Sequence, residues 1–251
     1  MERIVILGVF AHPDDEFAIS GLISNSISMG AEVHLVSATK GEAGKIRNDK
    51  AKLLNKKSVA NIRQEEYIES CNHLKITKYH FLDLIDGESK KWDFPIAISR
   101  LINIIREINP THIISFDMNG CNGHPDHIAT SRIVKEASSS IENLEFIQVK
   151  MYPKWFLEKR LWWLPKQVRD KIITKFGVDN NSVTSIFTLN RSELSNKLKL
   201  LKIYSSQFPD EKNRYYKQNK FIIRQFAKYE CYFEESGKGL EILRRLGWNF
   251  R

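Results

Sequence analysis

The chain contains 251 residues, 42% of them hydrophobic, and carries a formal net charge of +9. This length suffices for one sizeable hydrophobic core. No apolar run approaches the roughly 20 residues of a membrane-spanning helix, and the amino terminus lacks a signal-peptide pattern, so we expect a soluble cytoplasmic protein. The cysteines, Cys71, Cys121 and Cys231, are too widely spaced to predict a disulfide framework or a cysteine-based zinc site.

Strand and helix patterns alternate along the first 150 residues. Apolar runs rich in β-branched residues predict strands, and the segments between them have helical spacing. The predicted strands cover residues 3–10, 31–38, 78–84, 111–117 and 145–151, and the predicted helices cover residues 17–29, 59–74, 94–108 and 126–140. The alternation predicts an α/β fold with a Rossmann-like, mainly parallel sheet flanked by helices.

The rest of the chain is less regular. Residues 182–189 predict a further strand and residues 191–208 a helix, whereas the final forty or so residues fit no element. No internal repeat or linker interrupts the sequence. We therefore interpret residues 1–251 as one domain, with a core of about 1–150 and a less regular C-terminal elaboration of about 151–251.

The first predicted strand runs into a loop that concentrates one imidazole and three carboxylates, in the stretch VFAHPDDEFAIS at residues 9–20. Pro-Asp-Asp-Glu is also a common start of a helix, because proline suits the first helical position and acidic side chains complement the helix dipole. Taken alone, this loop leaves a purely structural interpretation open.

A second loop repeats the order of strand, sharp turn, His-Pro-Asp and helix. The strand at 111–117 leads into a turn containing Gly120 and Gly123, and the next residues are His124, Pro125, Asp126 and His127. Ligands of open α/β sheets bind outside the carboxyl ends of the strands. Two such loops are therefore expected to converge in one crevice, which chance helix starts would not predict.

The residue types in the two loops suggest a catalytic metal site. A catalytic zinc takes three nitrogen or oxygen ligands and keeps one position open; His12, Asp15 and His127 would supply two imidazoles and a carboxylate. Asp14 and His124 would remain beside the metal as a general base and as a cationic or hydrogen-bonding electrophile, with a protonated His124 the more useful form. Zn2+ suits this donor set, and Fe2+ accepts the same ligands.

The paired motifs, AHPDDE at residues 11–16 and GHPDH at residues 123–127, resemble the signatures of the PIG-L/LmbE-like family of metal-dependent de-N-acetylases. Four further stretches sit in family order: TKGEAG at 39–44, RQEE at 63–66, DLIDGE at 83–88 and YSSQ at 204–207. The resemblance covers about residues 3–135. It implies an LmbE-like fold and hydrolysis of the acetamide of an N-acetylglucosamine-type sugar conjugate to acetate and a free amine.

The resemblance also implies the metal-ligand, base and stabiliser roles given above, and it adds substrate contacts. Arg63 is expected to reach a polar group of the substrate, and Asp86 a sugar hydroxyl. Some family members place a carbonyl-polarising tyrosine where this chain has Asn122, a shorter hydrogen-bond donor. Glu42 follows the second strand, where lining of the site and simple loop solvation both stay open. Glu16 suits a supporting or helix-capping role.

Two other classes of function stay open. A non-haem Fe(II) oxygenase would use the same His/Asp/His set, with His12 and Asp14 as its His-x-Asp pair, but those enzymes have an all-β fold. A basic nucleic-acid or membrane-surface binding protein would leave both histidine motifs unexplained. We therefore expect a zinc-dependent de-N-acetylase whose partner is a small N-acetylated amino-sugar conjugate, not a nucleic acid. The sequence does not indicate an oligomeric state.

Residues 150–175 hold most of the net positive charge, with eight Lys or Arg residues against Glu158 and Asp170. The stretch also contains four large aromatic residues, Trp155, Phe156, Trp162 and Trp163. The simpler interpretation is a partly buried surface helix with a solvated basic face. The alternative is a rim or lid beside the crevice that favours an anionic or lipid-linked aglycone, with peripheral membrane contact.

Overall fold

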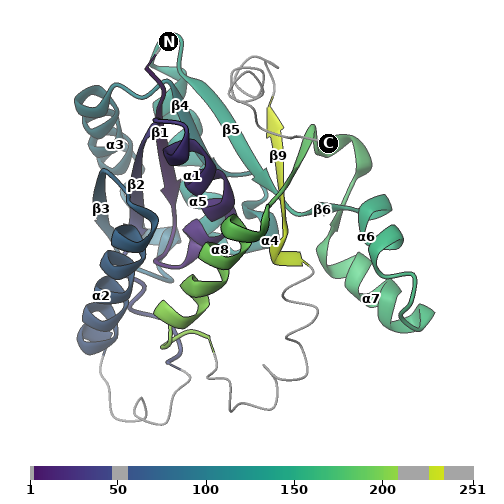
Figure 1. Ribbon diagram of the computed structural model, residues 1–251. Coiled ribbons are helices and arrows are strands. Elements are labelled where there is room, and N and C mark those ends of the chain that lie inside the picture. Colours follow the sequence, from purple (N-terminus) through teal and green to yellow (C-terminus); the bar gives the residue numbers. More distant parts are fainter. Residues whose placement is uncertain (1–2, 47–55, 209–225, 235–251) are drawn as a thin grey trace.

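The computed structural model describes residues 3–46, 56–208 and 226–234. Its centre is a seven-stranded sheet with helices on both faces (Figure 1) and the strand order β3-β2-β1-β4-β5-β9-β8. The first five strands are parallel: β1 Val5–Phe10, β2 Glu32–Thr39, β3 Lys78–Leu84, β4 His112–Phe116 and β5 Glu145–Lys150. The mainly parallel α/β fold predicted from the sequence is therefore confirmed.

Side-chain alternation along the strands divides the core into two layers. Ile6 and Phe10 of β1 pack into the layer under α1, α2 and α8, whereas Leu7 and Val9 pack into the layer under α3 and α5. The helices and 3-10 turns are η1 Asp15–Ile19, α1 Ser20–Ser28, α2 Lys56–Leu74, η3 Ser89–Lys91, α3 Phe94–Ile108, α4 Gly120–Gly123, α5 Pro125–Ser139, α6 Lys154–Arg160, α7 Lys166–Phe176, η4 Asn180–Ser182 and α8 Arg191–Ile203. β1, β2 and β4 are buried on both faces, which explains their nearly continuous apolar sequences, whereas β3 keeps exposed residues.

The C-terminal part completes the same sheet. β9, Tyr229–Glu234, pairs antiparallel with β5, and β8, Ser185–Thr188, pairs antiparallel with β9. The predicted strand at 182–189 is confirmed as β8, but no strand was predicted at β9. Glu230 interrupts the apolar pattern of β9, although this carboxylate is buried and paired with Lys197. The division into a core and a C-terminal elaboration stays a prediction.

Two further segments differ from their predicted form. The helix predicted for 191–208 ends at Ile203, because the following residues bond to groups of η1 and α2. The single surface helix considered for 150–175 is two short helices, α6 and α7, preceded by β6, Tyr152–Pro153, which pairs with β7, Gly177–Val178. Across the described residues, no helix combines the length and apolar character needed to cross a membrane.

Candidate metal centre

The two histidine loops lie side by side at one edge of the sheet. β1 and β4 are neighbouring parallel strands, with Leu7 paired to Ile113, so the loops that follow them emerge together at the carboxyl edge. The ring centroids of His12 and His127 are 5.2 Å apart, and those of His12 and His124 are 5.0 Å apart. The two histidine motifs therefore converge at one edge of the sheet, as predicted from the sequence.

His127 is held in one orientation. Its ring stacks on Phe116 with centroids 4.0 Å apart, and its Nδ1 lies 3.1 Å from the carbonyl oxygen of Gly120. Because Nδ1 donates its proton to this carbonyl, Nε2 keeps a lone pair, which is the form a metal-binding histidine needs. Gly120 permits this close approach, since a Cβ there would lie 2.8 Å from the Cβ of His127.

Asp15 bridges the two buried histidines. Its Oδ2 accepts the backbone N–H of His12 at 2.8 Å and lies 3.3 Å from His12 Nδ1, while its Oδ1 lies 3.4 Å from His127 Nε2. Burial raises the pKa of Asp15, but the nearby His127 and His12 outweigh burial and lower the pKa well below its ordinary value. Asp15 is therefore an anion between two imidazoles.

Two further carboxylates converge on the other side of His12. Its Nε2 lies 3.0 Å from Asp86 Oδ1 and 3.3 Å from Asp126 Oδ2. Burial alone would lower the pKa of His12, yet hydrogen bonds with Asp126, Asp15 and Asp86 raise that pKa well above its ordinary value. Carboxylates that surround one imidazole in a buried site concentrate negative charge, which is the environment that a bound cation requires.

Metal-ligating atoms cluster at this edge in two sets, neither of which contains the predicted ligand Asp15. Among the described residues, two sets of side chains place such atoms within 4.8 Å of one another: His12, His124 and His127, and His12, Asp86 and Asp126. The donors are imidazole nitrogens and carboxylate oxygens, which fit zinc or ferrous iron. No role was predicted for Asp126 from the sequence, where an acidic residue in the first turn of a helix also has an ordinary structural explanation.

Asp14 occupies a strained position at the edge of this cluster. Its φ is 96°, in the left-handed region that non-glycine residues seldom adopt. Its backbone N–H donates to Glu16 Oε2 at 3.1 Å, and its Oδ2 lies 3.1 Å from Arg63 Nη2. Burial raises the pKa of Asp14 to about 7, although the Arg63 charge opposes the shift. Perturbed carboxylates in such surroundings are candidate general bases.

Arg63 is buried against this loop. Its guanidinium donates to the carbonyl oxygens of Gly41, at 3.2 Å, and Pro13, and only 4% of the residue is exposed. The stretches TKGEAG and RQEE therefore meet around Asp14. The contact of Arg63 with a substrate polar group stays a prediction, because its contacts in the structure are to the protein.

Glu16 holds the backbone of Asp14 in position. Its buried carboxylate accepts hydrogen bonds from Ser70 of α2 and from the hydroxyl of Tyr204, besides the N–H of Asp14. Glu66 of α2 in turn accepts the N–H and the hydroxyl of Ser206 at 2.8 and 2.6 Å. The RQEE and YSSQ stretches thus fasten α2 and the end of α8 to the Asp14 loop.

The other predicted site residues lie around the same edge. His124 is exposed and its Nδ1 accepts the N–H of Asp126 at 3.3 Å, while Asn122 Oδ1 accepts the N–H of His124 at 3.0 Å. Asp86 Oδ2 accepts the N–H of Ala43 at 2.9 Å, and Glu42 Oε1 accepts the N–H of Asp86 at 3.0 Å. Their substrate contacts stay predictions.

A cavity of about 480 Å³ opens beside the metal centre. Its polar lining includes Asp14, Asp15, Asn122 and His127 from the two histidine loops, and also Lys150, Lys197 and Glu230. Most of its wall is apolar and includes Phe17, Phe116, Tyr152, Phe176 and Tyr229. A ligand that reaches Asp14 and His127 would therefore lie beside apolar surface.

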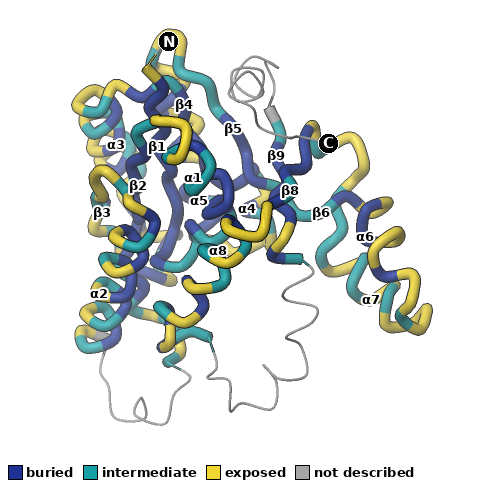
Figure 2. Tube along the Cα trace, in the orientation of Figure 1, coloured by how far each residue is buried: buried dark blue, intermediate teal, exposed yellow. Residues whose placement is uncertain are grey.

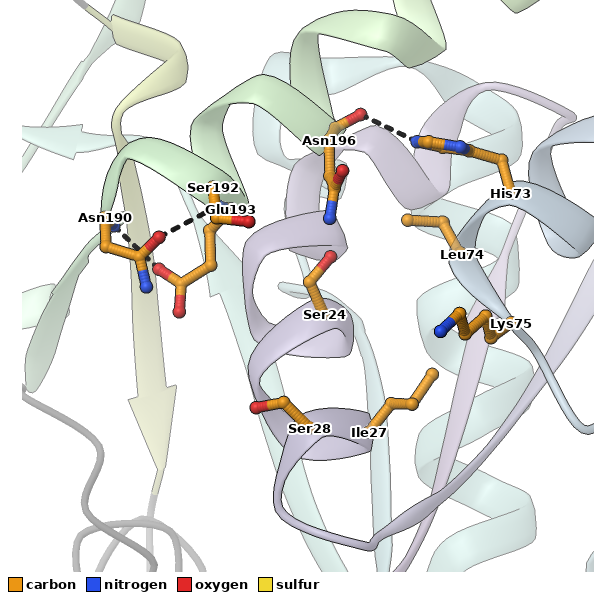
Figure 3. Close-up of a pocket in the computed structure, with 10 residues that line it drawn as sticks. All are labelled: Ser24, Ile27, Ser28, His73, Leu74, Lys75, Asn190, Ser192, Glu193 and Asn196. Carbon is orange, nitrogen blue, oxygen red and sulfur yellow. Dashed lines mark hydrogen bonds between the residues drawn. The ribbon is translucent and has the colours of Figure 1, made fainter.

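A second cavity, of about 330 Å³, lies between α1, α2 and α8 and is lined by the residues of Figure 3. His73 Nε2 lies 3.2 Å from the carbonyl oxygen of Asn196 across its rim, and Asn190 and Glu193 form the reciprocal capping box of α8. These polar groups are satisfied by the protein itself, and the metal-centre residues do not line this cavity.

The sequence matches the family model described as "PIG-L: GlcNAc-PI de-N-acetylase" over residues 7–138. This match spans more than half of the chain and includes both histidine loops, so the chain belongs to this family.

Curated relatives carry deacetylase names. A 1D-myo-inositol 2-acetamido-2-deoxy-alpha-D-glucopyranoside deacetylase of Thermomonospora curvata is 32% identical over 156 residues, which cover 53% of this chain and 51% of the relative. A Bacillus cereus protein named "Probable N-acetyl-alpha-D-glucosaminyl L-malate deacetylase 2" is 33% identical over 147 residues, covering 58% and 65%. The chain spans about half the length of the curated relatives it matches.

Solved structures show the same fold. N,N'-diacetylchitobiose deacetylase from Pyrococcus horikoshii matches with a TM-score of 0.64 at 21% identity, over 93% of this chain and 84% of its own. A deacetylase of the teicoplanin biosynthesis pathway matches with a TM-score of 0.61 at 14% identity, over 92% and 99%. The fold of this chain is therefore LmbE-like, as the resemblance implied.

Proposed function

We propose that this protein hydrolyses the acetamide of an N-acetylglucosamine-type sugar conjugate, yielding acetate and a free amino sugar. The observation that carries the proposal is the convergence of His12, Asp15 and His127 beside a half-buried carboxylate, Asp14, at the mouth of a cavity. Family membership supports the same reaction class.

His12, Asp15 and His127 would hold the metal, for which we propose Zn2+, with Fe2+ as the alternative. When bound, such a cation lowers the pKa of water and polarises a carbonyl oxygen. Asp126 and Asp86 would orient His12 through their contacts with its Nε2 edge, and Gly120 would fix the tautomer of His127 through its carbonyl.

Asp14 would remove the proton of the attacking water and later deliver it to the leaving nitrogen. Its position supports this role, because it lines the cavity and its other contacts, Glu16 and Arg63, hold it from the protein side. A general base works best with a pKa near the operating pH. Arg63 keeps the side chain of Asp14 in place, and burial raises the pKa of this carboxyl to about 7.

His124 would stabilise the negative charge that develops on the former carbonyl oxygen. Its Nδ1 accepts the N–H of Asp126, so Nε2–H is the donor that the ring can offer. Burial, with the neighbouring His12 and His127, lowers the pKa of His124. Neutral Nε2–H donation therefore fits the structure better than an imidazolium, and loss of one such donor typically costs about 3 kcal/mol of barrier.

The substrate is proposed as a small conjugate whose sugar meets Asn122 in the cavity and Asp86, Glu42 and Arg63 beside the metal centre. The apolar wall of the cavity would accept the attached group.

The test is a free-amine assay over a panel of N-acetylglucosamine conjugates, with inositol, malate, lipid and chito-oligomer aglycones. The protein is loaded with Zn2+ or anaerobically with Fe2+, and a chelator-treated sample is the control. We expect chelator-sensitive amine release from at least one conjugate. Metal-loaded protein that releases no amine from any member would contradict the proposal.

A further inference from the structure

The most exposed large apolar residues of the C-terminal part gather on one projecting segment, α6 and α7 with their connecting turn, here called the α6–α7 hairpin (residues 154–176). Figure 1 shows this hairpin beyond β6, apart from the sheet and its covering helices. Trp162 in the turn is 75% exposed, Trp163 is 47% exposed, and Trp155 and Val168 are 44% and 45% exposed. Exposed apolar residues that gather on one segment, rimmed by polar residues, mark interaction sites.

α7 has no buried residue, although it is a helix of 11 residues. Val168 and Ile172 lie four positions apart and therefore share one face, and both keep solvent contact, as the colours of Figure 2 show for the helix as a whole. A helix of a globular protein normally buries such a stripe against its core. α3, by contrast, buries Ala97, Leu101 and Ile105 completely or nearly so.

The hairpin is nevertheless attached firmly at its base. Phe156 of α6 packs edge-on against Tyr229 of β9 at 4.9 Å, and the Arg160 guanidinium lies 4.6 Å from the same ring. The hydroxyl of Tyr152 donates to the carbonyl oxygen of Phe226 at 2.7 Å. One side of α6 is thus committed to the protein, while α7 and the tryptophan turn point outward.

Charge accompanies the exposed apolar surface. The hairpin carries seven Lys or Arg residues against Glu158 and Asp170. Lys159, Lys166 and Lys171 are exposed. Basic side chains that flank exposed tryptophan and aliphatic residues match the chemistry of an anionic bilayer surface, where indole rings lie at the headgroup level and lysine ammonium groups meet lipid phosphates.

We propose that the α6–α7 hairpin docks this protein onto an anionic phospholipid bilayer. A nucleic acid would satisfy the charges, but its phosphates would leave Val168 and Ile172 without an apolar partner. Tyr152, just before the hairpin, and Phe176, at its end, line the cavity beside the metal centre, so docking would bring that cavity close to the bilayer. The docking does not depend on the reaction proposed above.

The test measures sedimentation of the full chain with vesicles of phosphatidylcholine alone or with about a quarter phosphatidylglycerol, at roughly 50 and 500 mM salt. Two variants change the hairpin: Trp162→Ala, and a triple variant with Lys159, Lys166 and Lys171 each changed to Gln. Their matched controls are Ile96→Ala, which removes another apolar side chain that is 50% exposed, and the exposed triple Lys90, Lys135 and Lys199 to Gln. Thermal unfolding confirms that every variant is folded.

We expect the wild-type protein to bind anionic vesicles, and this binding should weaken as the salt concentration rises. The hairpin triple variant should lose about a hundred-fold of its partition coefficient, since each of its three basic residues contributes to binding at an anionic surface. Trp162→Ala should lose several-fold, and both controls should bind nearly as the wild type does.

Three results would overturn the proposal. The first is no binding of the wild-type protein to anionic vesicles at low salt. The second is an equal loss in the hairpin and control triple variants, which would reflect net charge alone. The third is tighter binding to a DNA duplex than to the vesicles with the same dependence on the hairpin residues.

Discussion

The hydroxyl of Tyr204 donates a hydrogen bond to the carboxylate of Glu16, across a sequence separation of 188 residues. Glu16 accepts the N–H of Asp14 through its other oxygen. Tyr204 is therefore two hydrogen bonds from the proposed base, and the end of α8 helps to hold Asp14 in its left-handed conformation.

Tyr204→Phe should lower kcat by about ten-fold or more with little change in KM, because small displacements of a catalytic group are costly. Metal content should be unchanged. The matched control is Tyr232→Phe, which also removes a phenol donor to a buried carboxylate, here Glu230 at 2.7 Å. It should lose similar stability, about 1–3 kcal/mol, and keep its kcat. Equal kcat losses in both variants would show a structural effect only.

Gly41→Ala should impair catalysis through Arg63. A Cβ at Gly41 would lie 2.4 Å from Arg63 Nη1, and the φ of +72° adds strain. Gly30→Ala is the control, since its φ of +87° carries the same strain with nothing within 4 Å. Both variants should lose about 1–2 kcal/mol of stability, but only Gly41→Ala should lose turnover. Steady-state kinetics and thermal unfolding measure the two effects, and normal turnover of Gly41→Ala would contradict the role of Arg63.

Asp14→Asn should keep its metal and lose about a hundred-fold or more of kcat, because the amide cannot accept the proton. Asparagine tolerates the left-handed region, so the loop should keep its shape. Elemental analysis and kinetics on one preparation check both expectations, with the exposed Asp170→Asn as control. Turnover close to that of the wild type would remove Asp14 from the mechanism.

Asp126→Asn should weaken metal binding by about ten-fold to a hundred-fold, as is typical when a group that orients a metal ligand is changed. Competition with a fluorescent chelator measures the affinity. Asp93→Asn, which changes the helix cap of α3, is the control. An unchanged affinity would show that the contact of Asp126 with His12 Nε2 does not serve the metal.

The sequence was most informative where local pattern and chemistry coincide. The apolar runs of β1 and β4 and the two His-Pro-Asp loops predicted the fold, the edge of the sheet and the side chains that meet there. Contacts between distant segments could not be predicted, because no periodicity marks them. Glu16 with Tyr204, Glu66 with Ser206 and Arg63 with Asp14 pair only after the chain has folded.

A buried charged residue explains why β9 was not predicted from the sequence. Lys197 Nζ lies 2.6 Å from Glu230 Oε1, with side-chain exposures of 3% and 0%. Glu230 also accepts the N–H groups of Gly21 and Leu22, near the start of α1. In a sequence pattern, charged residues such as these indicate surface positions. Their burial is tolerated only because each charge has a partner in the folded protein.

Lys197→Met should therefore destabilise the protein by about 3–5 kcal/mol, since it leaves Glu230 buried without its cation. Lys199→Met, at an exposed position of the same helix, should have little effect. Chemical denaturation measures the free energy of unfolding of both variants. A loss for Lys197→Met no larger than that of the control would show that the pair contributes nothing to stability.

The central claim is that the centre formed by His12, Asp15 and His127 holds a metal on which amide hydrolysis depends. The most direct measurement titrates Zn2+, or anaerobically Fe2+, into chelator-stripped protein while acetate release from an accepted N-acetylglucosaminide is followed. Activity should be absent at the start, rise in proportion to bound metal and level off at about one equivalent per chain. His127→Ala should show neither tight binding nor turnover. Full activity in the stripped protein, or wild-type turnover in His127→Ala, would contradict the account.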